Sequence, residues 1–301
     1  MVKRQKTQIL ELSKNISRRT WYCFKNFFLG VDVLKQYLSY LNKIFSKKTL
    51  FQLIQKTKTT EELNLKLNEL YKEYQLLAKC YRNEYFFKNL LINTLIYKQS
   101  NPKSSIALTE IPIATSIVDL IVLSDNAIVF EIKTELDSLI RLESQLQNYY
   151  KAFSNVVVIT TKEIATKLLK EYKNTTIGIY FVNTDNHITI LKDYQSDFNN
   201  LEPKVMYNIL RKGERDSILL KYFKSLPEVS QIDYYQERLK QFLTLNKRLV
   251  YFDFIELLKQ RKINSEYYSS LSQFPEFLRY LAYFSKFSKS ELANLKRLFK
   301  L

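Results

Sequence analysis

The central third of the chain switches between two kinds of apolar pattern, and this switching limits the fold more than any other feature. Three short runs rich in β-branched residues come first, at residues 106–113, 117–123 and 127–133. Their length and composition predict three antiparallel strands. A helix, a strand, a second helix and a final strand are then predicted at residues 137–153, 156–160, 162–172 and 177–182. This order predicts an α/β fold in which helices flank a mixed sheet.

Helical periodicity is found on both sides of this core. Apolar residues recur three and four positions apart before it, and again after Pro203, which predicts amphipathic helices. We therefore expect a basic helical arm or subdomain at residues 1–60, a core domain at residues 61–195 and a helical C-terminal domain at residues 196–301.

The charge of the chain is uneven along its length. The net charge is +17, with +10 in residues 1–80, −1 in residues 81–200 and +8 in residues 201–301. Basic flanks around a neutral centre suit a protein that holds a polyanion, because lysine and arginine neutralise phosphates. The alternative is a lysine-rich surface that serves solubility alone.

Histidine, glycine and cysteine are so rare in the chain that several classes of active site are excluded. The single histidine, His187, lies in a polar segment where exposure is expected, and one histidine permits neither an HExxH site nor a histidine-centred zinc site. The three glycines form no phosphate-binding loop pattern. Cys23 and Cys80 are too few for a disulfide framework. No apolar run approaches membrane-spanning length, so we expect a cytoplasmic protein without a membrane partner.

The second and third strand runs bring three charged residues toward one place. Asp119 lies on the second run, and Glu131 and Lys133 end the third. If residues 124–126 form a three-residue loop, Asp119 lies opposite Glu131 and both side chains share a face of the sheet. A two-residue loop would separate them. Asn126 suits the left-handed third position of the longer loop, which favours the converging register.

Two carboxylates on adjacent buried strands repel each other unless a cation lies nearby. Mg²⁺ is the natural candidate because it is hard and is held by one or two carboxylates together with water and substrate phosphate. Lys133 can then orient or help to deprotonate an attacking water and offset the charge of the pentacovalent phosphate. The alternative is that Glu131 and Lys133 form an ordinary ion pair at the end of a strand.

The helix expected at residues 137–153 carries a polar stripe. Asp137, Arg141, Gln145 and Tyr149 recur at intervals of four, which places them on one side of a helix. Such a stripe beside a metal would meet phosphates or bases. We therefore predict that Arg141, Gln145 and Tyr149 bind nucleic acid, the alternative being a solvated helix face.

These residues together resemble the PD-(D/E)xK nuclease superfamily, in the subset whose helix carries a QxxxY element. The matching residues are Asp119, the triplet 131–133 and the pair Gln145 and Tyr149. The longer stretch FEIKTELDSLIRLESQLQNYYKAF resembles a bacterial branch known as Sce-type nuclease-like proteins. The resemblance covers about residues 80–185, and it departs from the superfamily pattern at Val118, which stands where many members have proline.

The resemblance implies a restriction-endonuclease-like mixed sheet and a specific ligand set. Asp119, Glu131 and the backbone carbonyl of Ile132 would bind the metal, and Lys133 would be the catalytic lysine. Many members add a glutamate from the helix before the sheet. Glu84 matches that place, and Glu110 is the second candidate.

The expected function is therefore a nuclease that uses Mg²⁺ or Mn²⁺ to hydrolyse phosphodiester bonds, with DNA as the expected substrate. Two alternatives stay open, namely a non-catalytic nucleic-acid-binding protein that keeps the nuclease fold and an RNA-directed nuclease. A homodimer would follow from cleavage of both strands. The superfamily includes restriction, repair, recombination and antiviral nucleases, so phage defence is one candidate setting.

Overall fold

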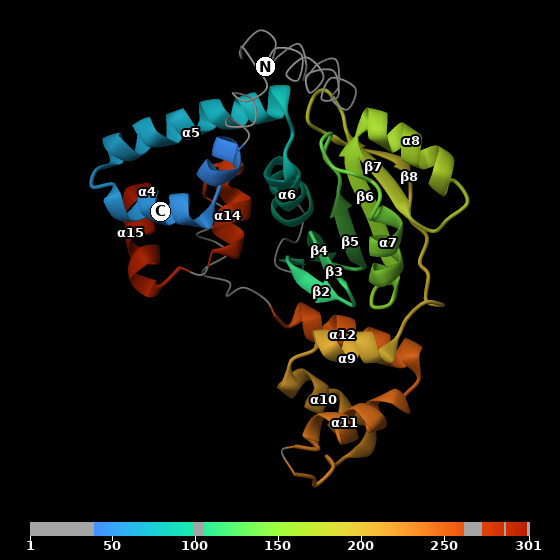
Figure 1. The fold of residues 1–301 in the computed structure, drawn as a ribbon. Helices are drawn as coiled ribbons and strands as arrows, with labels where there is room; N and C mark the ends of the chain where they lie inside the picture. Colours follow the sequence, from blue (N-terminus) through green and yellow to red (C-terminus); the bar gives the residue numbers. More distant parts are fainter. Residues whose placement is uncertain (1–38, 99–104, 231, 262–272, 286, 300–301) are drawn as a thin grey trace, which may run out of the picture. The chain divides into compact units, whose positions relative to one another are not determined.

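The computed structural model describes residues 39–98, 105–230, 232–261, 273–285 and 287–299 (Figure 1). Within these ranges it confirms the predicted α/β class, with a mixed sheet at the centre and helices before and after it. Most of the predicted N-terminal arm, residues 1–38, lies outside the described residues.

The main sheet has six strands in the order β1-β4-β5-β6-β7-β8. Neighbouring strands are antiparallel from β1 to β5, parallel from β5 to β7, and antiparallel again between β7 and β8. A separate two-stranded sheet is formed by β2 and β3. The strands are β1 (Ile106–Leu108), β2 (Ile111–Ile113), β3 (Ser116–Val118), β4 (Leu120–Leu123), β5 (Ala127–Ile132), β6 (Asn155–Thr161), β7 (Gly178–Val182) and β8 (Ile188–Lys192).

The first two predicted strands are each divided in two. Glu110 and Ala114 have positive φ angles of 58° and 52°, and the chain therefore turns sharply after β1 and again after β2. Neither residue is a glycine, so the sequence carries no signal of these turns. A bend at Asp119 then separates β3 from β4.

The strand β8 was not predicted, because its sequence follows a polar turn and its burial is only partial. Asn186 in that turn has a φ of 63°, and the backbone N–H of Asn183 donates to the carbonyl of His187 at 2.9 Å. The turn therefore returns the chain antiparallel to β7. His187 is exposed, as expected.

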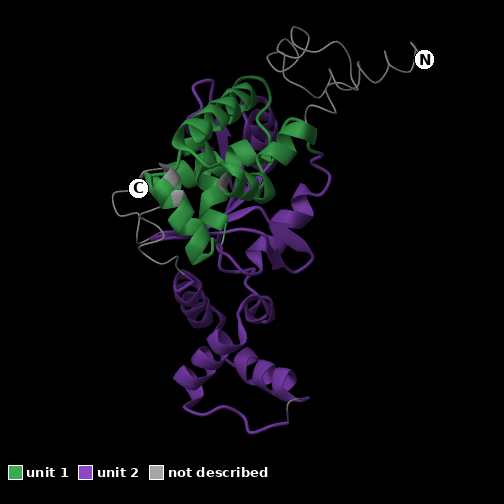
Figure 2. Cartoon of the chain, turned by 90° about the vertical axis from the view of Figure 1, so that its left-hand side faces the viewer, with its two compact units in different colours: residues 1–100, 133–137, 263–301 green, residues 101–132, 138–262 purple. Residues whose placement is uncertain are grey.

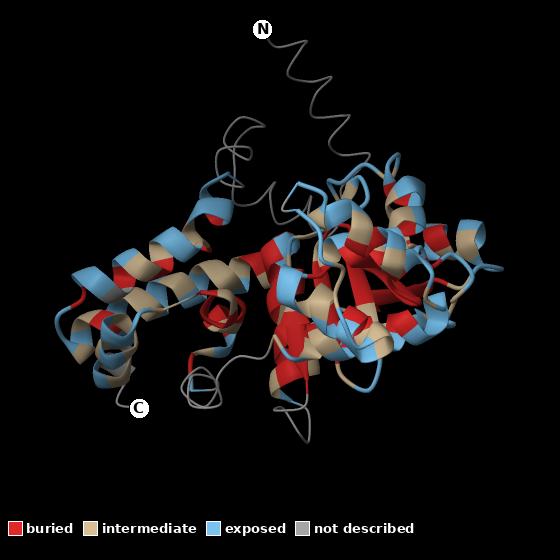
Figure 3. Cartoon of the chain, turned by 90° about the horizontal axis from the view of Figure 1, so that it is seen from below, coloured by how far each residue is buried: buried red, intermediate tan, exposed pale blue. Residues whose placement is uncertain are grey.

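The chain divides into two compact units (Figure 2). Unit 2 comprises residues 101–132 and 138–262 and contains all eight strands. Every residue of β6 and β7 is buried, as expected for parallel strands covered on both faces, and Figure 3 shows the buried strands in red. The helices of unit 2 are α7 (Leu142–Tyr150), α8 (Lys162–Tyr172), α9 (Pro203–Ile209), α10 (Lys212–Phe223), α11 (Tyr234–Leu243) and α12 (Lys247–Lys259).

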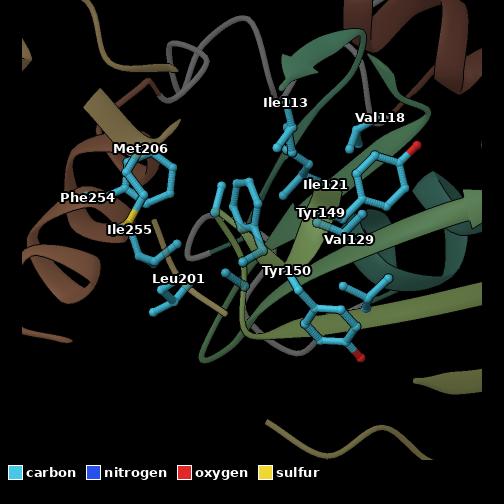
Figure 4. Close-up of a cluster of buried hydrophobic side chains, with 14 of the residues drawn as sticks. Ile113, Val118, Ile121, Val129, Tyr149, Tyr150, Leu201, Met206, Phe254 and Ile255 are labelled. Carbon is cyan, nitrogen blue, oxygen red and sulfur yellow. The ribbon is translucent and has the colours of Figure 1, made fainter. Parts of the chain in front are cut away.

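One face of the main sheet and these helices share a continuous apolar core. Ile121 of β4 and Val129 of β5 contribute to it from the sheet, Tyr149 from α7 and Phe254 from α12 (Figure 4). The helices of the C-terminal half thus complete the core that begins with the strands.

Unit 1 comprises residues 1–100, 133–137 and 263–301 and is helical wherever secondary structure is described. Asn89 and Asn93 join its two distant parts. The side-chain amides of both donate to the carbonyl of Glu276, at 3.0 and 2.8 Å, and Asn89 accepts from the backbone N–H of Tyr280 at 3.0 Å. Its elements are α4 (Lys47–Lys56), α5 (Thr60–Cys80), α6 (Glu84–Ile92), the π-helix η1 (Asn93–Tyr97), the 3-10 helix η3 (Glu276–Leu278), α14 (Arg279–Phe284) and α15 (Lys289–Phe299).

This division differs from the predicted boundaries at residues 60 and 195. Helices α5 and α6 belong with the C-terminal helices α14 and α15, because the Asn89 and Asn93 side chains satisfy backbone groups there. Such long-range pairing leaves no periodic trace in a sequence. None of the helices in the described ranges combines the length and apolar composition that crossing a membrane requires.

Replacing Phe153 by alanine should lower the free energy of unfolding by about 3–5 kcal/mol, because the side chain is fully buried and its ring lies 5.4 Å from that of Phe254. Urea denaturation of the full chain measures the change. As a control, Ile190→Ala on β8, where the side chain is 56% exposed, should change stability by less than about 0.5 kcal/mol. Equal losses in the two variants would contradict the core described above.

The buried phenol of Tyr150 should make stability fall in alkali. Burial, with a contribution from the Asp197 carboxylate, raises the pKa of Tyr150 to about 12. Since the unfolded pKa is about 10, this stabilisation is fully present below pH 10 and is lost as the pH rises through 12. Urea denaturation at several pH values should therefore show a shallower decline for Tyr150→Phe than for the wild type. Parallel declines would contradict the assignment.

Candidate functional site

The hairpin of β4 and β5 has the register that the sequence favours. Leu120 pairs with Phe130 and Leu123 with Ala127, and the backbone N–H of Ser124 donates to the carbonyl of Asn126 at 3.0 Å. The loop therefore contains three residues, 124–126. The same register, continued one position beyond the Leu120–Phe130 pair, sets Asp119 opposite Glu131. The three-residue loop is confirmed.

Two hydrogen bonds hold Asp119, one from β5 and one from the segment between β1 and β2. The backbone N–H of Ile132 donates to Asp119 Oδ2 at 2.8 Å. The hydroxyl of Thr109 donates to the backbone carbonyl of Asp119 at 2.7 Å. The carboxylate is thereby held at the end of the hairpin, against the strand that carries Glu131.

Glu131 is buried, with 2% of its surface exposed, and its carboxylate has a specific donor. The hydroxyl of Tyr149 on α7 donates to Glu131 Oε2 at 2.6 Å and also lies 3.1 Å from the carbonyl oxygen of Ile117. A charge-assisted bond of this kind offsets part of the cost of burying a carboxylate.

The Glu131 carboxylate lies on the α7 side of the sheet, where the Tyr149 hydroxyl reaches it. Val129, two residues from Glu131 along β5, contributes to the core beneath α7. Burial raises the pKa of Tyr149 well above its usual range, and the charges of Glu131 and then Asp119 raise it further. The charges of both carboxylates therefore act on the Tyr149 hydroxyl, and Glu131 is the one that bonds it.

Lys133 follows β5 directly and is 7% exposed, and Ile132 between it and Glu131 is 4% exposed. The triplet expected to carry the chemistry is therefore buried throughout. Lys133 begins the segment 133–137, in which the backbone N–H of Thr134 donates to Asp137 Oδ2 at 2.7 Å.

The polar stripe is shorter than predicted. Helix α7 begins at Leu142, with Arg141 as its N-cap residue, and not at Asp137. Asp137 lies outside the helix, and its carboxylate accepts a hydrogen bond from the backbone N–H of Thr134. Arg141 is exposed, and the side chain of Gln145 hydrogen-bonds Tyr149.

Tyr149 occupies a different position from the one expected of a nucleic-acid contact, because it is fully buried and bonds Glu131. The sequence carries a signal for this position. Leu142, Leu146, Tyr149 and Phe153 recur at alternating intervals of four and three, and all four side chains are buried.

The two candidate additional ligands have different surroundings. Glu84 begins α6 in unit 1, and its Oε1 lies 2.5 Å from Lys88 Nζ. This is the ion pair at i and i+4 that the sequence also allows. Glu110 is exposed in the turn between β1 and β2, where its backbone N–H donates to the carbonyl of Val118 at 3.1 Å. It belongs to the same unit as Asp119.

The donor set at the hairpin fits a small, hard divalent cation. Asp119 and Glu131 offer carboxylate oxygens, and the described residues contain no cluster of three or more Asp, Glu, His or Cys side chains. A cation held here would take its other ligands from backbone carbonyls, water and substrate, as Mg²⁺ commonly does. A thiolate- or imidazole-bound zinc does not fit this set.

The family described as bacteriophage P4 protein cII matches residues 77–275, about two thirds of the chain. The matched region includes all eight strands and the residues Asp119, Glu131 and Lys133. No curated protein and no solved structure matches the chain.

Replacing Tyr149 by phenylalanine should lower the free energy of unfolding by about 2 kcal/mol, because it removes a hydrogen bond to a buried carboxylate. Chemical denaturation measures the loss. Tyr71→Phe, at a tyrosine that is 45% exposed, is the control and should change stability by less than about 0.5 kcal/mol. A loss no larger than that of the control would show that the hydroxyl does not support Glu131.

Proposed function

We propose that this chain, which belongs to the bacteriophage P4 protein cII family, is a metal-dependent nuclease that hydrolyses phosphodiester bonds in DNA. One observation carries the proposal. The Glu131 carboxylate is buried near the end of β5, and the Asp119 carboxylate accepts from the backbone N–H of Ile132, the next residue of the same strand. A buried carboxylate with a second carboxylate beside it is costly unless a cation or a proton compensates them, which supports a metal site here.

Asp119, Glu131 and the backbone carbonyl of Ile132 would hold the metal, with Mg²⁺ or Mn²⁺ as the expected ion. A bound divalent cation supplies Lewis-acid stabilisation of the phosphate and lowers the pKa of a bound water. Glu110, which belongs to the same unit as Asp119, would be the additional carboxylate.

The chain's own residues would position the reactants. Tyr149 fixes the carboxylate of Glu131 through its hydroxyl, and Asp119 is fixed through the N–H of Ile132. Lys133, two residues beyond Glu131, would orient the attacking water and offset the negative charge that develops on the phosphate. Water would form the new P–O bond and release a proton to solvent, while the bond to the leaving oxygen breaks and that oxygen takes up a proton.

Basic surface residues support a nucleic-acid substrate. Arg141 at the start of α7 is exposed, close in sequence to the site. The helices α9 to α12 of unit 2 carry further exposed cations that suit contacts with a phosphate backbone. They are Lys204, Arg211, Lys212, Lys247 and Arg248.

The test is cleavage of matched DNA and RNA oligonucleotides by the purified chain with Mg²⁺ or Mn²⁺. We expect cleavage of DNA that EDTA abolishes, and losses of roughly 100-fold or more in Glu131→Gln and Lys133→Ala. Lys167→Ala, at an exposed lysine of α8, should cleave at the wild-type rate. Thermal melts verify that all variants fold.

The alternatives give different results in the same assay. Equal cleavage by the wild type and the Glu131→Gln and Lys133→Ala variants would refute the assigned site. Salt-sensitive binding without cleavage would indicate a non-catalytic nucleic-acid-binding protein. Cleavage of RNA alone would replace DNA by RNA as the substrate.

A further inference from the structure

The two-stranded sheet of β2 and β3 presents an apolar pair on its outer side. Pro112 and Ile117 are direct cross-strand partners, and both are exposed, Ile117 with 61% of its surface. The neighbouring positions Ile113 and Val118 point the other way and are fully buried (Figure 4). The hairpin therefore has one face in the core and one apolar pair in solvent.

Helix α7 holds this hairpin in place. The side-chain amide of Asn148 lies 2.9 Å from the hydroxyl oxygens of both Thr115 and Ser116. The backbone of Ile117 is tied to Tyr149 of the same helix. Three contacts from consecutive residues of one helix fix the two-residue turn, although Ala114 in that turn has the unfavourable φ of 52°.

The backbone of Ile117 lies close to the carboxylates. One hydroxyl, that of Tyr149, is 3.1 Å from the carbonyl oxygen of Ile117 and 2.6 Å from Glu131 Oε2. Asp119 follows Ile117 by two residues and lies against β5. The hairpin therefore lies next to the place where a phosphate would meet these carboxylates.

An apolar pair at this place has little to offer a phosphate, which cations and hydrogen-bond donors bind. It matches the flat, apolar face of a nucleobase. Proline and isoleucine are also among the side chains that nucleic-acid-binding proteins insert between stacked bases. A rigid hairpin suits this contact because little conformational entropy is lost on binding.

We propose that Pro112 and Ile117 form a base-contacting wedge, which packs against the nucleobase next to the phosphodiester bond that is cut. This inference rests on the proposed nuclease function and specifies its substrate. The wedge reads no hydrogen-bonding pattern, so it is tolerant of sequence. It favours bases that are already unstacked, as in single strands and frayed ends.

Binding to a short single-stranded DNA, compared with a matched strand of abasic residues, tests the wedge. Fluorescence anisotropy in EDTA measures affinity without cleavage. We expect the wild type to prefer the strand with bases, and Ile117→Ser to bind that strand about five- to tenfold more weakly. Ile117→Ser should bind the abasic strand as the wild type does, and Ile117→Val should keep most of the affinity.

Ile190→Ser is the matched control, since Ile190 is 56% exposed on β8 of the same unit, and its affinity should equal that of the wild type. An equal loss of Ile117→Ser on both strands, or no loss on either, would overturn the wedge. Failure of the wild type to prefer bases would also overturn it.

These outcomes are separate from those of the cleavage assay. A wild type that shows base-dependent binding, lost in Ile117→Ser, but cuts no substrate would keep the contact with bases and refute the nuclease together with the position of that contact next to a cut bond. A wild type that cuts DNA but whose affinity is unchanged in Ile117→Ser would keep the nuclease and refute the wedge.

Discussion

The hydrogen bond between the Tyr149 hydroxyl and the Glu131 carboxylate is the contact on which the arrangement of the site depends. Burial of an ionised carboxylate without a partner is too costly for a folded protein. Tyr149 supplies that partner while its ring fills the core beneath the sheet. One side chain thus couples the packing of α7 to the position of an acidic group, so the core and the site are built by the same helix.

The local geometry of the site could be predicted, and its tertiary supports could not. The three-residue loop 124–126 has the expected register, but Asn126 does not adopt the left-handed conformation that was the reason for expecting it. The predicted helix starts too early, at Asp137, because the Asp137 carboxylate accepts a hydrogen bond from the backbone N–H of Thr134. Such a local bond competes with helix formation, and the spacing of apolar residues gives no sign of it. The exposed pair on β2 and β3 could not be anticipated without the turn at Ala114.

Function is constrained at a coarser level than structure. The family match covers the strands and the three charged residues together, and the donor set favours a hard cation over zinc. The basic flanks and the wedge both suit a nucleic-acid strand, one through its phosphates and the other through its bases. Substrate choice would then depend on how readily a base leaves its stack as well as on charge.

The way unit 1 is assembled from distant segments bears on the order of events during synthesis. Unit 2 consists of residues 101–262 without residues 133–137, so all of its residues have been made once residue 262 is added. Asn89 and Asn93 must wait for Glu276 and Tyr280, more than 180 positions later, before their amides are satisfied. Domains generally fold as units while the ribosome is still translating. Helix α6 therefore cannot complete its contacts with residues 276–280 until after every residue of the sheet has been made.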